Sequence, residues 1–276
     1  MVAKTPGRRV GMLTSETMHP EGARYAASIV CVPGLWARPA VWRGFASFLA
    51  HRGWECHLLD VHEVPGGIAA RGEAVGEYVA ALPGVAVLVG HDAGALVTLA
   101  AAARHRPAAV VLLAPAASGG RAARRLVLTP RSVLALVLGG PVAPPAGSAA
   151  APWLDLPEPF AAGVRNALAP DDAASVRDVV WGRFQPPPLD GVPALLVAGD
   201  HDRLLAPGDA GALARAWGAE LRVLQGAGHW PFAGPRWQAT VALVHRWIVQ
   251  ALGEPLLELY AEAHAERDAE DDDAGD

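Results

Sequence analysis

Three loops of this 276-residue sequence carry polar side chains that could act together on a substrate. They contain Asp92, Asp202 and His229, in that order along the chain. A carboxylate is ionised at neutral pH and can attack an electrophilic carbon without a base to activate it. A histidine that a second carboxylate orients can then move protons to and from water. These residue types favour nucleophilic catalysis, provided that the fold brings the three side chains together.

Asp92 stands at the centre of a Gly-x-Asp-x-Gly pattern bounded by Gly90 and Gly94. The run before it, 85–89, is β-branched and aliphatic without interruption and predicts a strand buried on both faces. Residues 95–102 are rich in Ala and Leu and predict a helix. A chain that passes from strand to helix in so few residues must turn sharply, which small neighbours allow. An ordinary helix N-cap also explains Asp92, because aspartate is a favoured capping residue.

Two further loops, each after a predicted strand, carry the other candidates. Residues 199–203 offer two carboxylates, Asp200 and Asp202. We expect Asp202, which lies further into the loop, to reach the histidine, and Asp200 to fix the loop. The alternative is an Asx turn ahead of the next helix. Residues 226–232 contain two glycines, which let this loop present His229.

A fourth stretch, Pro33-Gly34-Leu35-Trp36, also follows a predicted strand. Its glycine lets the backbone turn back over Asp92, so that the N–H groups of Leu35 and Ala93 could bind a developing anion at one point. A plain Pro-Gly turn explains the tetrapeptide equally well.

Strands and helices alternate along most of the chain, which predicts a parallel sheet covered on both faces. The predicted strands are 27–32, 55–61, 85–89, 108–113, 194–198 and 220–224. The predicted helices are 40–52, 72–82, 95–102, 121–127, 130–138, 158–168, 173–184, 207–217 and 235–252, after a leading hairpin that starts near Arg9. Residues 114–188 interrupt the alternation and predict a helical insertion over the carboxyl ends of the strands, where the sites of such sheets lie.

The chain from about residue 28 to 252 resembles the α/β-hydrolase superfamily, whose members place nucleophile, acid and histidine in this order. The resemblance implies the α/β-hydrolase fold, with an eight-stranded, mostly parallel sheet flanked by helices. It implies a core of residues 1–113 and 189–253 and a helical cap of residues 114–188. It also implies a catalytic triad and two oxyanion donors, which would be Asp92, His229 and Asp202, with Leu35 and Ala93.

An aspartate at the nucleophile position resembles the haloalkane dehalogenase and epoxide hydrolase branch of the superfamily. The resemblance implies that Asp92 displaces a halide or opens an epoxide on a small apolar substrate, and that water activated by His229 hydrolyses the resulting alkyl ester. It implies neither a cofactor nor a metal. The leaving-group residues are atypical. Ala93 stands where many dehalogenases have Trp, Leu35 where some have Asn, and residues 114–188 contain no tyrosine of the kind epoxide hydrolases use.

Four tryptophans are candidates for the substrate pocket, namely Trp36, Trp153, Trp181 and Trp230. The indole N–H groups of Trp153 and Trp181 could serve a leaving group, although packing of the cap onto the core also explains these aromatic side chains. A polar donor from the cap near Asp92 would favour dehalogenation or epoxide opening. A wholly apolar lining would favour a different reaction.

Two other functions are compatible with the sequence. Asp92 could be a general base in a lyase or isomerase of the same fold, which would form no covalent adduct. The chain could also be a non-catalytic binding protein on a hydrolase scaffold, although such a site has no need of all three candidate residues.

The composition limits the classes of partner. The net charge is −5, and residues 262–276 hold eight acids against one arginine, so that the rest of the chain carries about +2. The sequence therefore lacks the basic charge that favours nucleic-acid binding. We expect the acidic extension 254–276 to end in disorder. No signal peptide or membrane-length apolar run is evident, so we expect a soluble cytoplasmic protein with no membrane partner. Cys31 and Cys56 predict buried free thiols.

Overall fold

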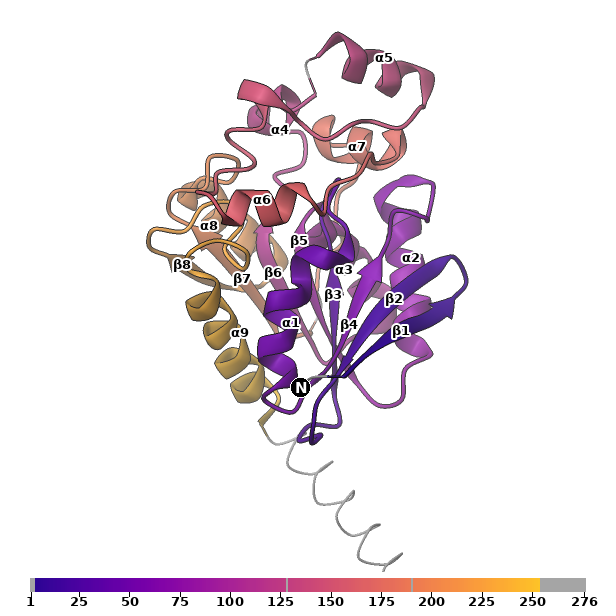
Figure 1. Ribbon diagram of the computed structural model, residues 1–276, viewed down its shortest axis with the longest axis vertical. Helices are drawn as coiled ribbons and strands as arrows, with labels where there is room; N and C mark the ends of the chain where they lie inside the picture. The colour runs from indigo at the N-terminus through magenta and orange to yellow at the C-terminus, as the bar shows by residue number, and fades with distance from the viewer. Residues whose placement is uncertain (1–2, 128, 190, 254–276) are drawn as a thin grey trace, which may run out of the picture.

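The computed structural model describes residues 3–127, 129–189 and 191–253. Its centre is an eight-stranded sheet with the order β1-β2-β4-β3-β5-β6-β7-β8 (Figure 1). The strands are β1 (Ala3–Val10), β2 (Leu13–His19), β3 (Ser28–Val32), β4 (Glu55–Asp60), β5 (Ala86–Asp92), β6 (Ala109–Pro115), β7 (Ala194–Gly199) and β8 (Glu220–Leu224). β2 pairs antiparallel with β1 and β4, and all other pairs are parallel. The predicted fold class is confirmed.

Helices cover both faces of the sheet, as Figure 1 shows. α1 and α9 contact each other on one face, and α2 and α3 contact each other on the other. The helices outside the segment between β6 and β7 are η1 (Pro39–Trp42), α1 (Arg43–Ala50), α2 (Gly67–Ala80), α3 (Ala93–His105), α8 (Pro207–Trp217) and α9 (Trp237–Ala251) among the described residues. Within the described part of the chain, no helix combines the length and the apolar character that a membrane span requires.

The chain between β6 and β7 lies above the carboxyl ends of the strands (Figure 1). We call its described residues, 116–127, 129–189 and 191–193, the cap segment. It contains α4 (Arg121–Arg125), α5 (Pro130–Leu138), η2 (Gly147–Ala149), α6 (Phe160–Arg165) and α7 (Ala173–Val180). The division of the chain into core and cap domains stays a prediction, and the acidic extension 254–276 lies outside the described residues.

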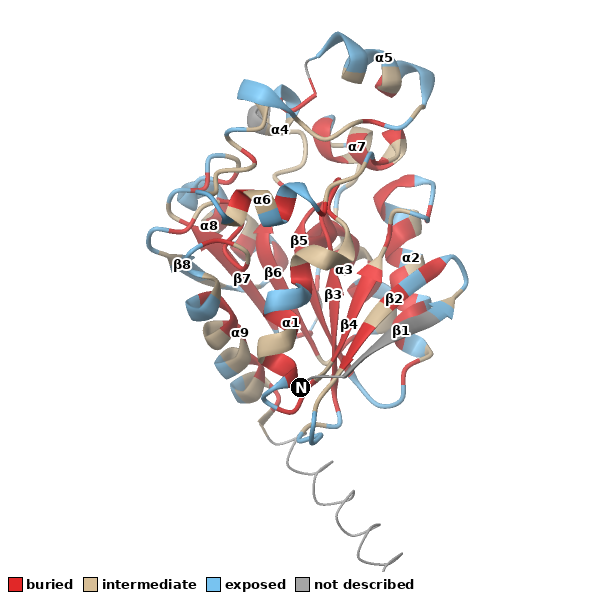
Figure 2. Ribbon diagram, viewed as in Figure 1, coloured by how far each residue is buried: buried red, intermediate tan, exposed pale blue. Residues whose placement is uncertain are grey.

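The central strands form the core of the molecule. Every residue of β3, β5, β6 and β7 is buried, which Figure 2 shows as a red band through the sheet. The unbroken apolar runs of these strands suit a sheet that is covered on both faces. Cys31 and Cys56 are buried free thiols, as expected.

Some element bounds differ from the sequence-based expectation. α2 begins at Gly67 rather than at residue 72, because the carboxylate of Asp178 in α7 accepts the N–H of Ile68 at 2.9 Å and so satisfies the first turn of the helix. The leading hairpin forms, but its turn lies at Gly11, which has a φ of 58°. α6 and α7 are shorter than the helices predicted at 158–168 and 173–184.

Candidate active site

Asp92 occupies a strained turn at the end of the central strand. It is the last residue of β5 and has a φ of 51° and a ψ of −123°, and α3 begins at the next residue. Such a backbone conformation costs a non-glycine residue about 1–3 kcal/mol and is found preferentially at functional sites. The flanking glycines make the turn possible. A Cβ on Gly90 would lie 2.5 Å from the carbonyl oxygen of Gly94, and a Cβ on Gly94 would overlap the carbonyl oxygen of Val32.

The Asp92 carboxylate turns away from its own helix. It stands at the N-cap position of α3, but its side chain makes no capping hydrogen bond. Its Oδ2 instead accepts the N–H of Leu35 at 3.2 Å. Gly34 permits this approach, since a Cβ there would lie 2.7 Å from the Cβ of Asp92. The N-cap explanation of Asp92 is therefore wrong, and the carboxylate belongs to the junction between the β3 loop and the turn.

His229 lies between two carboxylates. Its Nδ1 donates to Asp202 Oδ2 at 3.0 Å, and its Nε2 lies 3.7 Å from Asp92 Oδ1. The second oxygen of Asp202 accepts the N–H groups of Leu204 and Leu205 at 2.8 and 3.1 Å, which fixes the carboxylate in its loop. The structure thus brings together the three side chains that the sequence singled out.

Asp200 has the loop-fixing place that we expected for it. Its Oδ1 accepts the N–H of Gly226 at 2.7 Å, which ties the loop after β7 to the loop that carries His229. Ala93 is the first residue of α3, where backbone N–H groups have no acceptor within the helix. A role of Ala93 as an oxyanion donor stays a prediction.

The charges around His229 favour its protonated form. Burial alone would lower the pKa of His229, but the charge of Asp202, its hydrogen bond and the nearby Asp92 carboxylate raise it to about 10. Burial alone would raise the pKa of Asp202, yet the charge and hydrogen bond of His229 and the two backbone N–H groups lower it. The pair is therefore an imidazolium and a carboxylate at neutral pH.

A small pocket borders Asp92 and His229. The cavity measures about 20 Å³, which is room for about one water molecule. Apart from these two side chains its lining is apolar, and the described lining residues are Leu35, Trp36, Ala116, Ala117, Ala123, Leu126, Val179, Val180 and Leu204. Because the cap segment supplies much of this wall, it must move to admit a larger substrate.

Only one of the four candidate tryptophans lines this pocket. Trp36 does so, but its indole N–H donates to the carbonyl oxygen of Val142 at 2.9 Å. Trp153 packs edge-on against Trp36 and Trp230, with ring centroids 5.5 and 5.3 Å away, and accepts the Trp230 indole N–H on its backbone oxygen. Trp181 is 42% exposed and does not reach the pocket. No cap tryptophan N–H group is thus offered to Asp92 by the described lining.

Sequence reasoning missed a buried ionic cluster that joins the cap segment to the core. Asp171, which precedes α7, accepts the N–H of Trp36 at 2.9 Å and pairs with Arg71 of α2 and His62. The other ring nitrogen of His62 contacts Asp60 at 3.2 Å. Nothing in the sequence around His62 indicates that it would contact Asp171. These contacts depend on how the cap packs, which no local motif reports.

A second contact of the same kind reaches the histidine loop. Asp155 of the cap segment accepts the backbone N–H of His229 with both carboxylate oxygens, at 2.9 and 3.1 Å. The only sequence signal was the scarcity of acids around it, because residues 93–154 contain neither Asp nor Glu.

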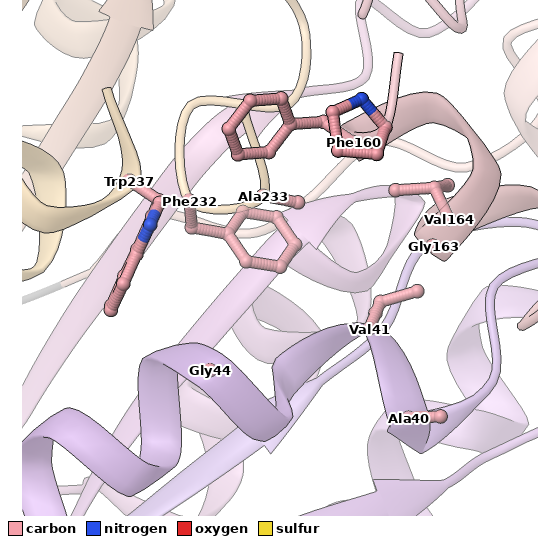
Figure 3. Close-up of a pocket in the computed structure, with 10 residues that line it drawn as sticks. Ala40, Val41, Gly44, Phe160, Gly163, Val164, Phe232, Ala233 and Trp237 are labelled. Atoms are coloured by element: carbon pink, nitrogen blue, oxygen red, sulfur yellow. The ribbon is translucent and has the colours of Figure 1, made fainter. Parts of the chain in front are cut away.

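A separate surface groove does not belong to this site. It lies between α1, α6 and the start of α9, and its wall includes Val41, Phe160, Phe232 and Trp237, as Figure 3 shows. Its lining contains neither Asp92 nor His229. Among the described residues, no cluster of three His, Cys, Asp or Glu side chains has the arrangement of a metal site.

The chain matches the sequence profile of a known protein family. Residues 29–243 match the sequence profile of the alpha/beta hydrolase family. No curated protein sequence matches the chain significantly.

Many solved structures share the fold. A monoglyceride lipase variant from Saccharomyces cerevisiae has a TM-score of 0.69 at 12% identity, and the alignment covers 91% of this chain and 97% of the lipase. A monoacylglycerol lipase from Paleococcus ferrophilus has a TM-score of 0.66 at 19% identity, covering 87% and 99%. An esterase from Thermogutta terrifontis has a TM-score of 0.61 at 16% identity, covering 91% and 99%. These low identities show a common fold and no more.

Proposed function

The chain belongs to the alpha/beta hydrolase family, and we propose that it is a hydrolase that attacks a saturated carbon of a small apolar substrate with Asp92. The first step gives an alkyl ester of this aspartate, which water then hydrolyses. His229, oriented by Asp202, transfers the protons, and the N–H groups of Leu35 and Ala93 stabilise the anion that forms on the ester.

The observation that carries this proposal is the hydrogen bond from the Leu35 N–H to Asp92 Oδ2, at 3.2 Å. When Asp92 Oδ1 bonds to the substrate carbon, Oδ2 becomes the carbonyl oxygen of the ester. The attack of water turns that oxygen into an anion. A donor that is already in place stabilises the anion without rearrangement.

Each step balances in atoms and charge. Asp92 Oδ1 forms a bond to carbon, and the bond from this carbon to the leaving group breaks with its electron pair on the leaving group. His229 Nε2 then takes a proton from water, and the hydroxide adds to Asp92 Cγ. Collapse of the tetrahedral anion expels the alkoxide, which takes the proton of the newly added hydroxyl group, so the alcohol leaves and Asp92 is again a carboxylate.

The proposed substrate is an epoxide rather than an alkyl halide. Among the described lining residues of the pocket, His229 is the side chain that can donate a proton, and its raised pKa of about 10 keeps it protonated. An epoxide oxygen that accepts this proton leaves a neutral imidazole, which is the form needed to activate water. Displacement of a halide consumes no proton, so His229 would first have to lose its proton to solvent before it could act as a base.

The apolar lining also favours a second candidate. With no cap donor directed at Asp92 among the described lining residues, the carboxylate could act as a base in a lyase or isomerase. Such an enzyme would form no bond between Asp92 and the substrate.

A trapping experiment separates these candidates. The wild-type protein, which keeps the proton donor His229, is mixed with styrene oxide or with 1-bromohexane and quenched within a single turnover. The peptide that contains Asp92 should then gain the mass of the epoxide adduct. Mass gain with the bromide only would support the halide branch. An Asp92 peptide that stays unmodified with both probes at every quench time, while the protein converts either of them, would contradict covalent catalysis. If the wild-type protein converts neither probe, the proposed substrate class is wrong.

A further inference from the structure

The backbone of His229 is held from two directions. On one side its N–H donates to the carboxylate of Asp155 in the cap segment, at 2.9 and 3.1 Å. On the other side its carbonyl oxygen contacts Nε2 of the buried His91 at 2.8 Å. The cap and the core thus each fix one end of the same residue.

The histidine loop is shaped to receive this carboxylate. A Cβ on Gly228 would overlap the carboxyl group of Asp155, so only glycine allows the approach. Gly226, with a φ of 69°, lies two residues earlier and adds further backbone freedom. The indole N–H of Trp230 donates to the carbonyl oxygen of Trp153 at 2.7 Å and provides a second link between this loop and the same stretch of the cap.

The carboxylate of Asp155 is half-buried, and both of its oxygens accept the backbone N–H of His229. Burial raises the pKa of Asp155, while the N–H and the charge of His229 lower it. Burying a carboxylate is costly unless it has a partner, and the partner of Asp155 is the histidine of the triad.

We propose that Asp155 is a positioning residue for His229, and that closure of the cap segment sets the imidazole between Asp202 and Asp92. The pocket has room for about one water molecule, so the cap must open to admit a substrate and close again before reaction. Opening withdraws the acceptor from the His229 N–H. The loop is then held by the core alone, and proton transfer is efficient only over a closed site.

This inference rests on the proposed function in one respect, namely that His229 transfers protons. It does not depend on whether Asp92 forms an ester. The test therefore needs one measurement without substrate and one with it.

The variants separate hydrogen bonding from charge. Asp155→Ala removes the acceptor, whereas Asp155→Asn keeps a carbonyl acceptor and loses the charge. Asp178→Ala is the matched control, because Asp178 is also a cap carboxylate that accepts a core N–H, from Ile68 at 2.9 Å, and its pKa is also raised by burial. Gly228→Ala displaces the carboxylate from the loop side and covers the case that Asp155→Ala fails to fold.

The substrate-free measurement is the low-field proton NMR signal of the His229 Nδ1–H that donates to Asp202, identified by its loss in His229→Gln. We expect Asp155→Ala and Gly228→Ala to broaden or shift it, and Asp155→Asn and Asp178→Ala to keep it. With styrene oxide, Asp155→Ala should lower kcat by about tenfold to a hundredfold, as expected for a displaced catalytic group, at a nearly constant KM, and Asp155→Asn should recover most of the loss.

Two results would overturn the inference. Asp155→Ala could leave the signal and kcat at wild-type values, or Asp178→Ala could change both as strongly as Asp155→Ala does. If the signal responds as expected but no variant or wild-type protein forms an Asp92 adduct, the positioning role stands and the proposed function fails.

Discussion

Asp92 Oδ2 lies 3.2 Å from the backbone nitrogen of Leu35 and accepts its N–H. The other oxygen of the carboxylate faces His229 Nε2 at 3.7 Å. The two oxygens therefore have different neighbours, a donor for the one and a proton carrier for the other. This asymmetry suits a nucleophile that attacks with Oδ1 and keeps Oδ2 as the carbonyl oxygen of an ester.

The first prediction concerns the carboxylate itself. Asp92→Asn keeps the size of the side chain and removes the negative charge, so turnover of an epoxide probe should fall by about a thousandfold or more, in line with loss of a nucleophile. Thermal unfolding of the variant should stay close to wild type or rise, because a buried charge is removed. Residual activity within tenfold of wild type would argue against a nucleophilic role.

The second prediction is the pH dependence of stability. The pKa of His229 is raised from 6.5 to about 10, so its contribution is fully present below pH 6.5 and is lost as the pH rises towards 10. Asp202, whose pKa is lowered, contributes stability that is lost only in acid, as the pH falls through its lowered pKa. Urea unfolding across this alkaline range should show a falling midpoint in the wild type and a flatter curve in His229→Gln. Equal slopes in both proteins would contradict the assignment.

The third prediction tests the glycine beneath the carboxylate. A Cβ on Gly34 would lie 2.7 Å from Asp92 Cβ and 2.8 Å from Oδ2, so Gly34→Ala should displace the Leu35 N–H and lower kcat strongly. Gly44→Ala is the control, since nothing lies within 4 Å of its added Cβ. The control should keep full activity and, as a helix residue, gain up to about 1 kcal/mol in stability. Similar kinetics in the two variants would count against the close approach.

The fourth prediction concerns the buried ionic cluster that joins the cap segment to the core. Asp171 is buried with Arg71 and His62, and Asp171→Ala takes from the buried guanidinium one of its two carboxylate partners, leaving Asp172. Such a change costs about 3–5 kcal/mol, which denaturant unfolding can measure. The double variant Arg71→Met with Asp171→Leu should recover much of the loss. A single variant as stable as the wild type would show that the cluster contributes little.

Local sequence patterns were sufficient for the parts of the site that single turns create. The turn at Asp92 requires glycine at positions 90 and 94, because a Cβ at either position would overlap backbone atoms. The sequence shows both glycines directly. The choice of Asp202 over Asp200 followed from its place in the loop, and the distances to His229 and Gly226 agree with it.

The contacts of the cap segment could not be predicted in the same way. Asp155 and Asp171 gain their partners only when the cap packs on the core, over sequence separations of 74 to 135 residues. The orientation of Trp181, which is exposed, and of Trp153, which is packed between two other tryptophans, depends on the same packing. Helical periodicity can show that such side chains belong to an apolar face of a helix. It cannot show which other part of the protein that face packs against.

The most direct measurement is a single turnover of styrene oxide in water enriched in oxygen-18, followed by mass spectrometry of the peptide that contains Asp92. Hydrolysis at Asp92 Cγ exchanges a carboxylate oxygen, so the account predicts that the label enters Asp92 and that the diol from the first turnover carries unlabelled oxygen. Label that appears in the diol alone, with Asp92 unlabelled, would mean that water attacks the substrate directly and would contradict the covalent mechanism.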